Sequence, residues 1–363
     1  TSIGVDSMGN IETYLKSYGE YTFLEKEFNE VDNVILSLIS YIDLYDIVPG
    51  IKGGKITLKD ASKKFYNKYS QKEINQNIVA VKGASNLLKE LASTKRYKDL
   101  LLYNYVYKVT FDMQFGALCI MLPNKNVYVS YEGTDGYISG WKEDCMLACS
   151  FPNNAQIEAI NYLNKVVGLF SHGVYVGGHS KGGHLAIVAG MFCKSRVRHK
   201  IISIFNNDGP GLRNKEFESN KYKRINKKLV YIVPKGSIVG MLLCHNDNPI
   251  VVDSKARGIM QHSALSWIVD EDKFKRAKLS ESSIKFDTAV ATWISKLDDK
   301  QRLDFINGLF SVLKKADINS LVELKKAKLD STIKIIKETK NMNKETRNML
   351  LVCFKDLYEE IRK

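Results

Sequence analysis

The stretch YVGGHSKGGHLAIVAG at residues 175–190 constrains the fold of this chain more than any other part of the sequence. It places Ser180 between Gly178 and Gly182. In a G-x-S-x-G pattern the serine stands on a sharp strand-to-helix turn, where larger side chains in place of the glycines would collide with it. GVYVGG before it predicts a strand and GGHLAIVAGMFC after it predicts a helix. The stretch therefore predicts a nucleophilic serine on such a turn; the alternative is a glycine-rich turn without chemistry.

Residues 99–269 alternate between strand and helix patterns. Helices are expected over 155–170, from 181 and over 215–227. Strands are expected in LYNYVYKVTF, FGALCIML, NVYVSYEG, GVYVGG, KIISIFNND, KLVYIVP and PIVVD. Strands that alternate with helices form a mainly parallel sheet covered on both faces. The fold class predicted is α/β, a three-layer αβα arrangement of the hydrolase type.

The sequence divides into four parts, of which the α/β core is one. Residues 1–50 are expected to be the N-terminal helical part of the hydrolase domain, with a buried helix over 29–46. Residues 51–98 form a basic helical insert, residues 99–275 the α/β core, and residues 276–363 a C-terminal helical segment. That last segment contains amphipathic patterns such as FDTAVATWISKL and RLDFINGLFSVLKKA.

Composition narrows the class of protein. The chain has 363 residues and is 44% hydrophobic, which is enough for a large buried core. It contains no run of about 18 apolar residues and begins without a basic segment followed by an apolar one, so a cytoplasmic location is expected. Six cysteines are scattered along the chain, and the close pair Cys145 and Cys149 lacks further ligands at metal-site spacing, so both are interpreted as packing thiols. No metal or cofactor is expected.

Basic residues are in excess, with 54 Lys and Arg against 40 Asp and Glu. Residues 51–100 carry 12 basic and 4 acidic residues, and residues 271–363 carry 21 and 15. No zinc-finger spacing, RNA-binding signature or basic heptad accompanies them, so nucleic acid is not an expected partner. The excess is interpreted as solvated lysine faces on helices, with peripheral contact to an anionic membrane as the alternative.

A serine nucleophile needs a base from elsewhere in the fold. His179 and His184 share the turn and its helix, and they are interpreted as packing or surface residues. His262, in SKARGIMQHSALSW after the last predicted strand, fits the order serine, acid, histidine better than His245 does. His262 is therefore the predicted base.

The acid is expected at the carboxyl end of a strand near the nucleophile, where it can orient the imidazole. Asp208 ends IISIFNND, whereas the commoner place one strand later reads KGSIVG and offers Ser237. Asp208 is the predicted acid and Asp253 the alternative. The backbone amide of Lys181 and the Gly133–Thr134 turn are the predicted oxyanion donors, unless that turn is an ordinary loop.

YVSYEGTDGYISGWKED, GGHSKGGHLAI and NNDGPG together resemble the class 3 lipase-like branch of the α/β-hydrolases. FNEVDNVILSLISYID, VPKGSIVGMLL and QHSALSW resemble more closely the bacterial Mbeg-like family of lipase-like domains, from about residue 10 to residue 270. The resemblance implies Ser180 as nucleophile, His262 as base, Thr134 at the oxyanion and a lid-like segment near 137–151 containing Trp141. The chain departs from the pattern at Glu132, where a basic residue is usual, and at Ser237, where an acid is usual.

Two functions follow from these predictions. The first is a serine hydrolase that cleaves a carboxylic ester, a small molecule or a lipid or lysolipid, through an acyl-enzyme on Ser180. The second is a catalytically silent binding or scaffold protein that keeps the hydrolase fold. Labelling of Ser180 by a fluorophosphonate separates the two.

Overall fold

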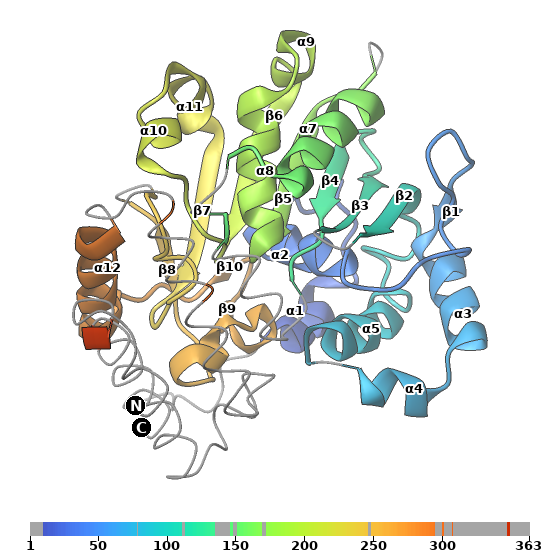
Figure 1. Cartoon of the computed structure of the whole chain (residues 1–363). Coiled ribbons are helices and arrows are strands. Elements are labelled where there is room, and N and C mark those ends of the chain that lie inside the picture. Colours follow the sequence, from blue (N-terminus) through green and yellow to red (C-terminus); the bar gives the residue numbers. More distant parts are fainter. Residues whose placement is uncertain are drawn as a thin grey trace, which may run out of the picture.

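The computed structural model describes residues 10–77, 79–110, 113–134, 146–147, 151–168, 172–245 and 248–294, together with residues 300, 307 and 347–348. Figure 1 shows a central twisted sheet with helices packed around it. The strands are β1 (Ile56–Thr57), β2 (Leu101–Val109), β3 (Gln114–Met121), β4 (Val127–Tyr131), β5 (Val174–His179), β6 (Ile201–Asn207), β7 (Leu229–Pro234), β8 (Ile250–Val252), β9 (Val269–Asp270) and β10 (Lys273–Phe274).

The helices fall into three groups along the chain. Before β2 lie α1 (Ile11–Tyr18), α2 (Glu30–Ile39), α3 (Leu58–Lys68), α4 (Gln71–Gln76) and α5 (Val79–Leu91). Between its strands lie α7 (Asn154–Val166), α8 (Lys181–Phe192), α9 (Ser195–Arg198), α10 (Asn214–Phe217), α11 (Asn220–Ile225) and the 3-10 turn η2 (Asn226–Lys228). After β8 follow the 3-10 turns η3 (Gly258–His262) and η4 (Ala264–Ser266), and then α12 (Glu281–Ile294).

The first eight strands form one sheet in the order β1 to β8, so each strand lies beside its neighbour in the chain. Strands β1 to β4 pair antiparallel, and β4 to β8 pair parallel. Strands β9 and β10 form a separate hairpin. In the parallel half the carboxyl ends of β5 and β6 lie side by side, at the edge where α/β proteins commonly place their sites.

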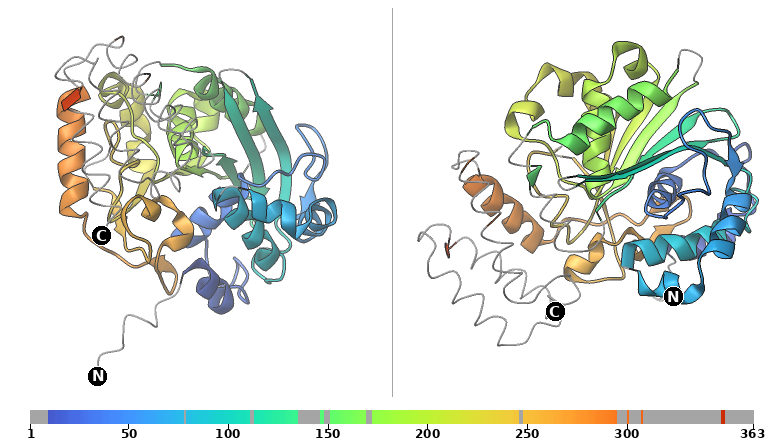
Figure 2. Two further views of the ribbon diagram at one scale, coloured as in Figure 1. Left: turned by 60° about the horizontal axis from the view of Figure 1, so that its bottom comes forward. Right: turned by 45° about the vertical axis from the view of Figure 1, so that its right-hand side comes forward.

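Side chains of β4 alternate between the two faces of the sheet, as the period of a strand requires. Val127, Val129 and Tyr131 pack in the same hydrophobic cluster as α7 and α8. Tyr128 packs with α2, and the Ser130 hydroxyl donates to the carbonyl of Leu36 on α2. Figure 2 shows the resulting layers, with green helices on one face of the sheet and blue ones on the other. Helices cover both faces of the sheet, which explains why consecutive residues of strands such as β3 and β4 are buried.

Helix α2 is held on the sheet by buried polar groups as well as by apolar contact. The Asn33 side chain donates to Asn207 on β6 at 2.8 Å and accepts from Tyr128 on β4 at 2.8 Å. The fully buried carboxylate of Asp32 receives two hydrogen bonds from Arg96, at 2.6 and 2.9 Å. This helix therefore sits in a fixed position beneath the end of β6.

The structure confirms the predicted α/β class. Every strand expected between residues 99 and 269 is present, as are the helices expected near 155, 181 and 215. The prediction of one helix over 29–46 is wrong at its end, because α2 stops at Ile39 and the chain turns through Ser40 and Tyr41. The basic insert adds β1 to the edge of the sheet through pairing with β2. The division into four parts stays a prediction.

Among the predicted C-terminal helices, the one at FDTAVATWISKL corresponds to α12, and the later ones lie outside the described residues. Most of the predicted lid-like segment with Trp141, and the pair Cys145 and Cys149, also lie outside them. No helix in the described ranges has both the length and the apolar character needed to cross a membrane.

Candidate active site

The backbone at Ser180 has the sharp turn that the G-x-S-x-G pattern predicts. Ser180 follows β5 directly and precedes α8, with φ 57° and ψ −132°, a conformation that residues other than glycine rarely adopt. The two motif glycines allow it: a Cβ on Gly178 would lie 2.3 Å from the backbone of Gly182, and one on Gly182 would lie 2.1 Å from the Tyr131 carbonyl. The strained turn brings the side chain of Ser180 to the carboxyl end of the parallel strands.

His262 and Asp208 meet Ser180 in a continuous hydrogen-bonded chain. The Nε2 atom of His262 lies 3.0 Å from the Ser180 hydroxyl, and its Nδ1 atom lies 2.7 Å from Oδ2 of Asp208. Ser180 is 3% exposed and Asp208 is 0% exposed, so water is largely excluded around both. A carboxylate accepts the Nδ1 proton of a histidine, which leaves Nε2 as the acceptor for a serine proton.

Asp208 is held by donors on its other oxygen. Its Oδ1 atom accepts from the Ser237 hydroxyl at 2.5 Å and from the Gly240 amide at 3.2 Å. Asp208 itself has φ 51° directly after β6, and its amide donates to the Ile232 carbonyl on β7. Ser237, at the place where an acid is usual, thus stabilises the carboxylate that comes from the preceding strand.

Asp253 does not face His262. Its carboxylate lies 2.7 Å from the Lys235 ammonium and 3.5 Å from that of Lys275. Burial opposes its charge, but the hydrogen bonds and the two lysines outweigh burial and lower the pKa of Asp253. The two lysines therefore hold Asp253 as part of a surface ion pair.

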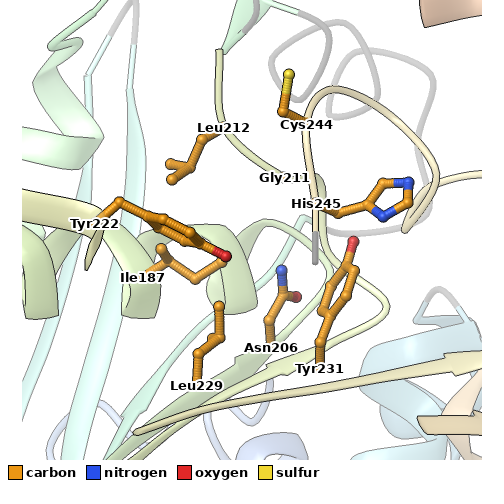
Figure 3. Close-up of a pocket in the computed structure, with 9 residues that line it drawn as sticks. All are labelled: Ile187, Asn206, Gly211, Leu212, Tyr222, Leu229, Tyr231, Cys244 and His245. Atoms are coloured by element: carbon orange, nitrogen blue, oxygen red, sulfur yellow. The ribbon is translucent and has the colours of Figure 1, made fainter. Parts of the chain in front are cut away.

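His245 lies away from Ser180, at a small pocket. Figure 3 shows His245 beside Tyr231, with Leu212 and Cys244 nearby. Its Nε2 atom lies 3.5 Å from the carboxylate of Asp287 on α12. Of the two histidines considered for the base, His262 is the one brought to the serine.

The predicted oxyanion donors lie close to Ser180 in the chain or in space. Lys181 is the first residue of α8, and backbone amides at the start of a helix can donate to a negative charge. Its side chain is 1% exposed, and its ammonium donates to the Gln114 carbonyl at 3.0 Å. The side-chain amide of Gln114 donates to the Glu132 carboxylate at 3.3 Å. Glu132 directly precedes the turn that holds Gly133 and the buried Thr134. A Cβ on Gly133 would lie 2.4 Å from the His179 carbonyl, so this turn packs against the nucleophile strand.

Two histidines near the serine are buried and neutral. Burial and the nearby His262 lower the pKa of His179 to about 3, and burial lowers the pKa of His184 to about 4. The Nδ1 group of His184 donates to the Gly211 carbonyl at 2.8 Å, and its Nε2 atom accepts from Gln156 at 2.8 Å. The predicted packing role fits His184.

His179 touches His262 and Ser237 touches Asp208, and the sequence patterns did not predict these two contacts. His179 makes a side-chain hydrogen bond to the main chain of His262, and Ser237 makes one to Asp208. A signal existed for each, since His179 directly precedes Ser180 and Ser237 stands where an acid is usual. Within the described part of the chain, no group of three or more His, Cys, Asp or Glu side chains is placed to hold a metal.

The mostly parallel sheet with helices on both faces, and the strained serine between β5 and α8, define an α/β protein of the hydrolase type. The Mbeg1-like family model matches residues 91–311, more than half of the chain, so the protein belongs to the Mbeg1-like family. The model begins later than the predicted resemblance and extends past residue 270 into the C-terminal segment. Among solved structures, that titled "Crystal structure of M37 lipase" is similar at 16% identity with a TM-score of 0.37, covering 57% of this chain and 68% of that chain. No curated protein matches.

Proposed function

We propose that this protein is a serine hydrolase that cleaves a carboxylic ester through an acyl-enzyme on Ser180. The observation that supports this most is the chain of contacts from the Ser180 hydroxyl through His262 to Asp208, at 3.0 and 2.7 Å. Separations of this size allow proton transfer without rearrangement of the three side chains. The strained backbone at Ser180 is a second, independent support.

In the first half of the reaction, Ser180 Oγ attacks the ester carbonyl while His262 Nε2 takes its proton. The imidazolium that forms is stabilised by the carboxylate of Asp208, which stays ionised. The negative charge on the carbonyl oxygen is met by the amide of Lys181 and by the turn at Gly133 and Thr134. The tetrahedral intermediate collapses, the C–O bond of the ester breaks, and His262 gives its proton to the leaving alcohol.

In the second half, water attacks the acyl group on Ser180. His262 removes a proton from that water, and the Ser180 oxygen leaves as the C–O bond of the acyl-enzyme breaks. His262 then returns the proton to Ser180, which restores the resting state and releases a carboxylic acid. These steps need no group beyond the three side chains, the oxyanion donors and water.

We propose a lipid or lysolipid ester as the substrate class. Support comes from the apolar and aromatic residues of GYISGWKEDCMLACSFP, which follow the predicted oxyanion turn in the sequence, and from the basic segments, which suit an anionic lipid surface. A panel of esters that differ in acyl length tests this part of the proposal. Preference for short, water-soluble esters over long-chain ones would contradict it.

Fluorophosphonate labelling tests the reaction type, because the probe reacts with an activated serine. We expect labelling of the wild-type protein that is lost in Ser180→Ala and strongly reduced in His262→Ala. Asp208→Asn should lower the rate by about four orders of magnitude, because the amide favours the wrong tautomer of the base. Ser130→Ala, at a buried serine on β4 whose hydroxyl donates to main-chain carbonyls of α2, is the matched control and should label normally.

A folded wild-type protein whose Ser180 does not react would contradict the proposal. That outcome would favour the second candidate, a binding or scaffold protein that keeps the hydrolase fold without turnover. Circular dichroism on the same samples establishes that the protein is folded.

A further inference from the structure

His179, the residue before the nucleophile, is in contact with the loop that carries the base. It ends β5, and its Nε2 atom lies 2.7 Å from the main-chain carbonyl oxygen of His262. The centroids of the two imidazole rings are 4.6 Å apart. One hydrogen bond therefore joins the strand of the nucleophile to the backbone of the base, across 83 residues of sequence.

The partners of His179 determine where its proton lies. Because the carbonyl of His262 can only accept, Nε2 carries the hydrogen and donates it. Nδ1 is then an acceptor, and it lies 2.9 Å from the hydroxyl of Tyr41, which donates. Each ring nitrogen has a partner of the right kind, so the ring is fixed in one tautomer and one orientation.

The carbonyl that His179 binds lies at the end of a 3-10 turn. His262 is the last residue of the 3-10 turn η3. The preceding carbonyl, that of Gln261, accepts from the indole of Trp267 at 2.8 Å. Two successive peptide units are thus held by buried side chains, and they set the position of the His262 Cα atom.

Tyr41 links His179 to the predicted oxyanion turn. A Cβ on Gly133 would lie 2.0 Å from the Tyr41 hydroxyl, so this hydroxyl packs directly against the predicted oxyanion turn. Hydrogen bonds therefore join the buried side chains of Tyr41 and His179 to the main chain of His262 in one row. The row connects the turn before Thr134 to the loop of the base.

We propose that His179 is a positioning residue: its Nε2–H bond to the His262 carbonyl holds the base within reach of Ser180. The proposal rests on the function proposed above. His179 itself transfers no proton in the reaction. Being neutral, it adds no positive charge beside His262 when that imidazole becomes protonated, which a second charged imidazole at this distance would oppose.

The test compares three neutral substitutions at residue 179. His179→Gln can place an amide N–H near the Nε2 position, His179→Asn is too short to reach the carbonyl, and His179→Leu has no donor. We expect fluorophosphonate labelling of Ser180 to fall about ten- to a hundredfold in the Leu and Asn variants, as a displacement of about 1 Å in a catalytic group produces. The Gln variant should recover most of the rate.

His184→Leu is the matched control, because His184 is also buried and neutral and also donates to a backbone carbonyl. It should label like the wild type once rates are corrected for the folded fraction. Equal loss in the His179 and His184 variants, or no recovery in His179→Gln, would overturn the proposal. If His179→Leu does not fold, the comparison of Gln with Asn still decides.

A second measurement is independent of reactivity at Ser180. The Nδ1–H proton of His262, hydrogen-bonded to Asp208, should give a downfield NMR signal in the wild type and in His179→Gln, and should be lost or broadened in His179→Asn. A wild type that shows this signal but does not label would contradict the hydrolase function and leave the positioning role supported. A signal unchanged in all variants would contradict the positioning role, whether or not the protein labels.

Discussion

The hydroxyl of Ser237 binds the carboxylate of Asp208, the acid of the proposed mechanism. It donates to Asp208 Oδ1 at 2.5 Å, on the oxygen opposite the one that faces His262. Because a hydrogen bond to a charged group contributes about 1.5–3 kcal/mol, we expect Ser237→Ala to slow fluorophosphonate labelling about ten- to a hundredfold. The fold should survive, since the substitution removes one oxygen atom. Labelling rates and thermal unfolding measured together test this.

Ser283→Ala is the control for Ser237→Ala. Ser283, on α12, donates to the main-chain carbonyl of Ser237 at 2.7 Å and leaves the Ser237 hydroxyl untouched. Labelling should change little in this variant. Similar losses in the two variants would mean that the loop as a whole matters, and the Ser237 hydroxyl would not be the cause.

At single residues, sequence reasoning identified the groups whose chemistry leaves a pattern. Ser180 lies in a motif, and His262 and Asp208 follow it at the ends of predicted elements, in an order typical of hydrolases. Asp208 was the preferred acid, but Asp253 stayed an alternative, because both follow strands and the lysines that bind Asp253 are brought to it only by the fold. The role of His179 was missed although it directly precedes Ser180, because its partner is a backbone carbonyl, which has no side-chain signature in the sequence.

Among the secondary-structure elements, α2 depends on a buried charge at its first turn. The Asp32 carboxylate is fully buried and has Arg96 as its countercharge. Removal of one partner leaves an uncompensated buried charge, so we expect Arg96→Leu to lower the free energy of unfolding by about 3–5 kcal/mol. Urea unfolding measures this loss.

The neighbouring residue offers a control for Arg96. Lys95 pairs with Glu25 at 3.2 Å, but both side chains are about half exposed. Exposed ion pairs contribute little because water and salt screen them, so Lys95→Ala should leave the unfolding midpoint nearly unchanged. A small loss for Arg96→Leu would show that α2 is held mainly by its apolar face.

The elements themselves were predictable because the period of apolar residues differs between strands and helices. The end of α2 was not, because the apolar pattern continues through Tyr41 and Ile42 although the helix has stopped. These residues are buried by the turn that carries Tyr41 to His179. Burial in a turn and burial on a helix leave the same pattern in the sequence.

For the whole molecule, the two buried neutral histidines make stability depend on pH. The pKa values of His179 and His184 are about 3 and about 4 in the folded protein, below the unperturbed value near 6.5. At pH values between the folded and the unperturbed pKa of each histidine, the unfolded chain binds a proton that the folded chain does not. The stability that these groups provide is therefore complete above pH 6.5 and is lost as the pH falls toward 4, by about 1.4 kcal/mol per pH unit for each histidine.

Urea unfolding at several pH values between 7 and 4.5 checks this dependence. Carboxylates also titrate in this range, so the comparison with His184→Gln isolates one histidine. In that variant the slope of the unfolding free energy against pH should be smaller by about 1.4 kcal/mol per pH unit, which corresponds to one proton. An identical slope would show that His184 binds its proton in the folded protein as readily as in the unfolded chain.

The strand order of the large sheet matches the direction in which a ribosome delivers the chain. Each new strand can add to an edge that is already present, without waiting for a later segment to be inserted between earlier ones. The strands that carry Ser180 and Asp208 can thus be in place while the loop at 258–262 is still to be made. A nascent or truncated chain that stops before that loop holds Ser180 without His262, so under the proposed function we expect it not to react with a fluorophosphonate.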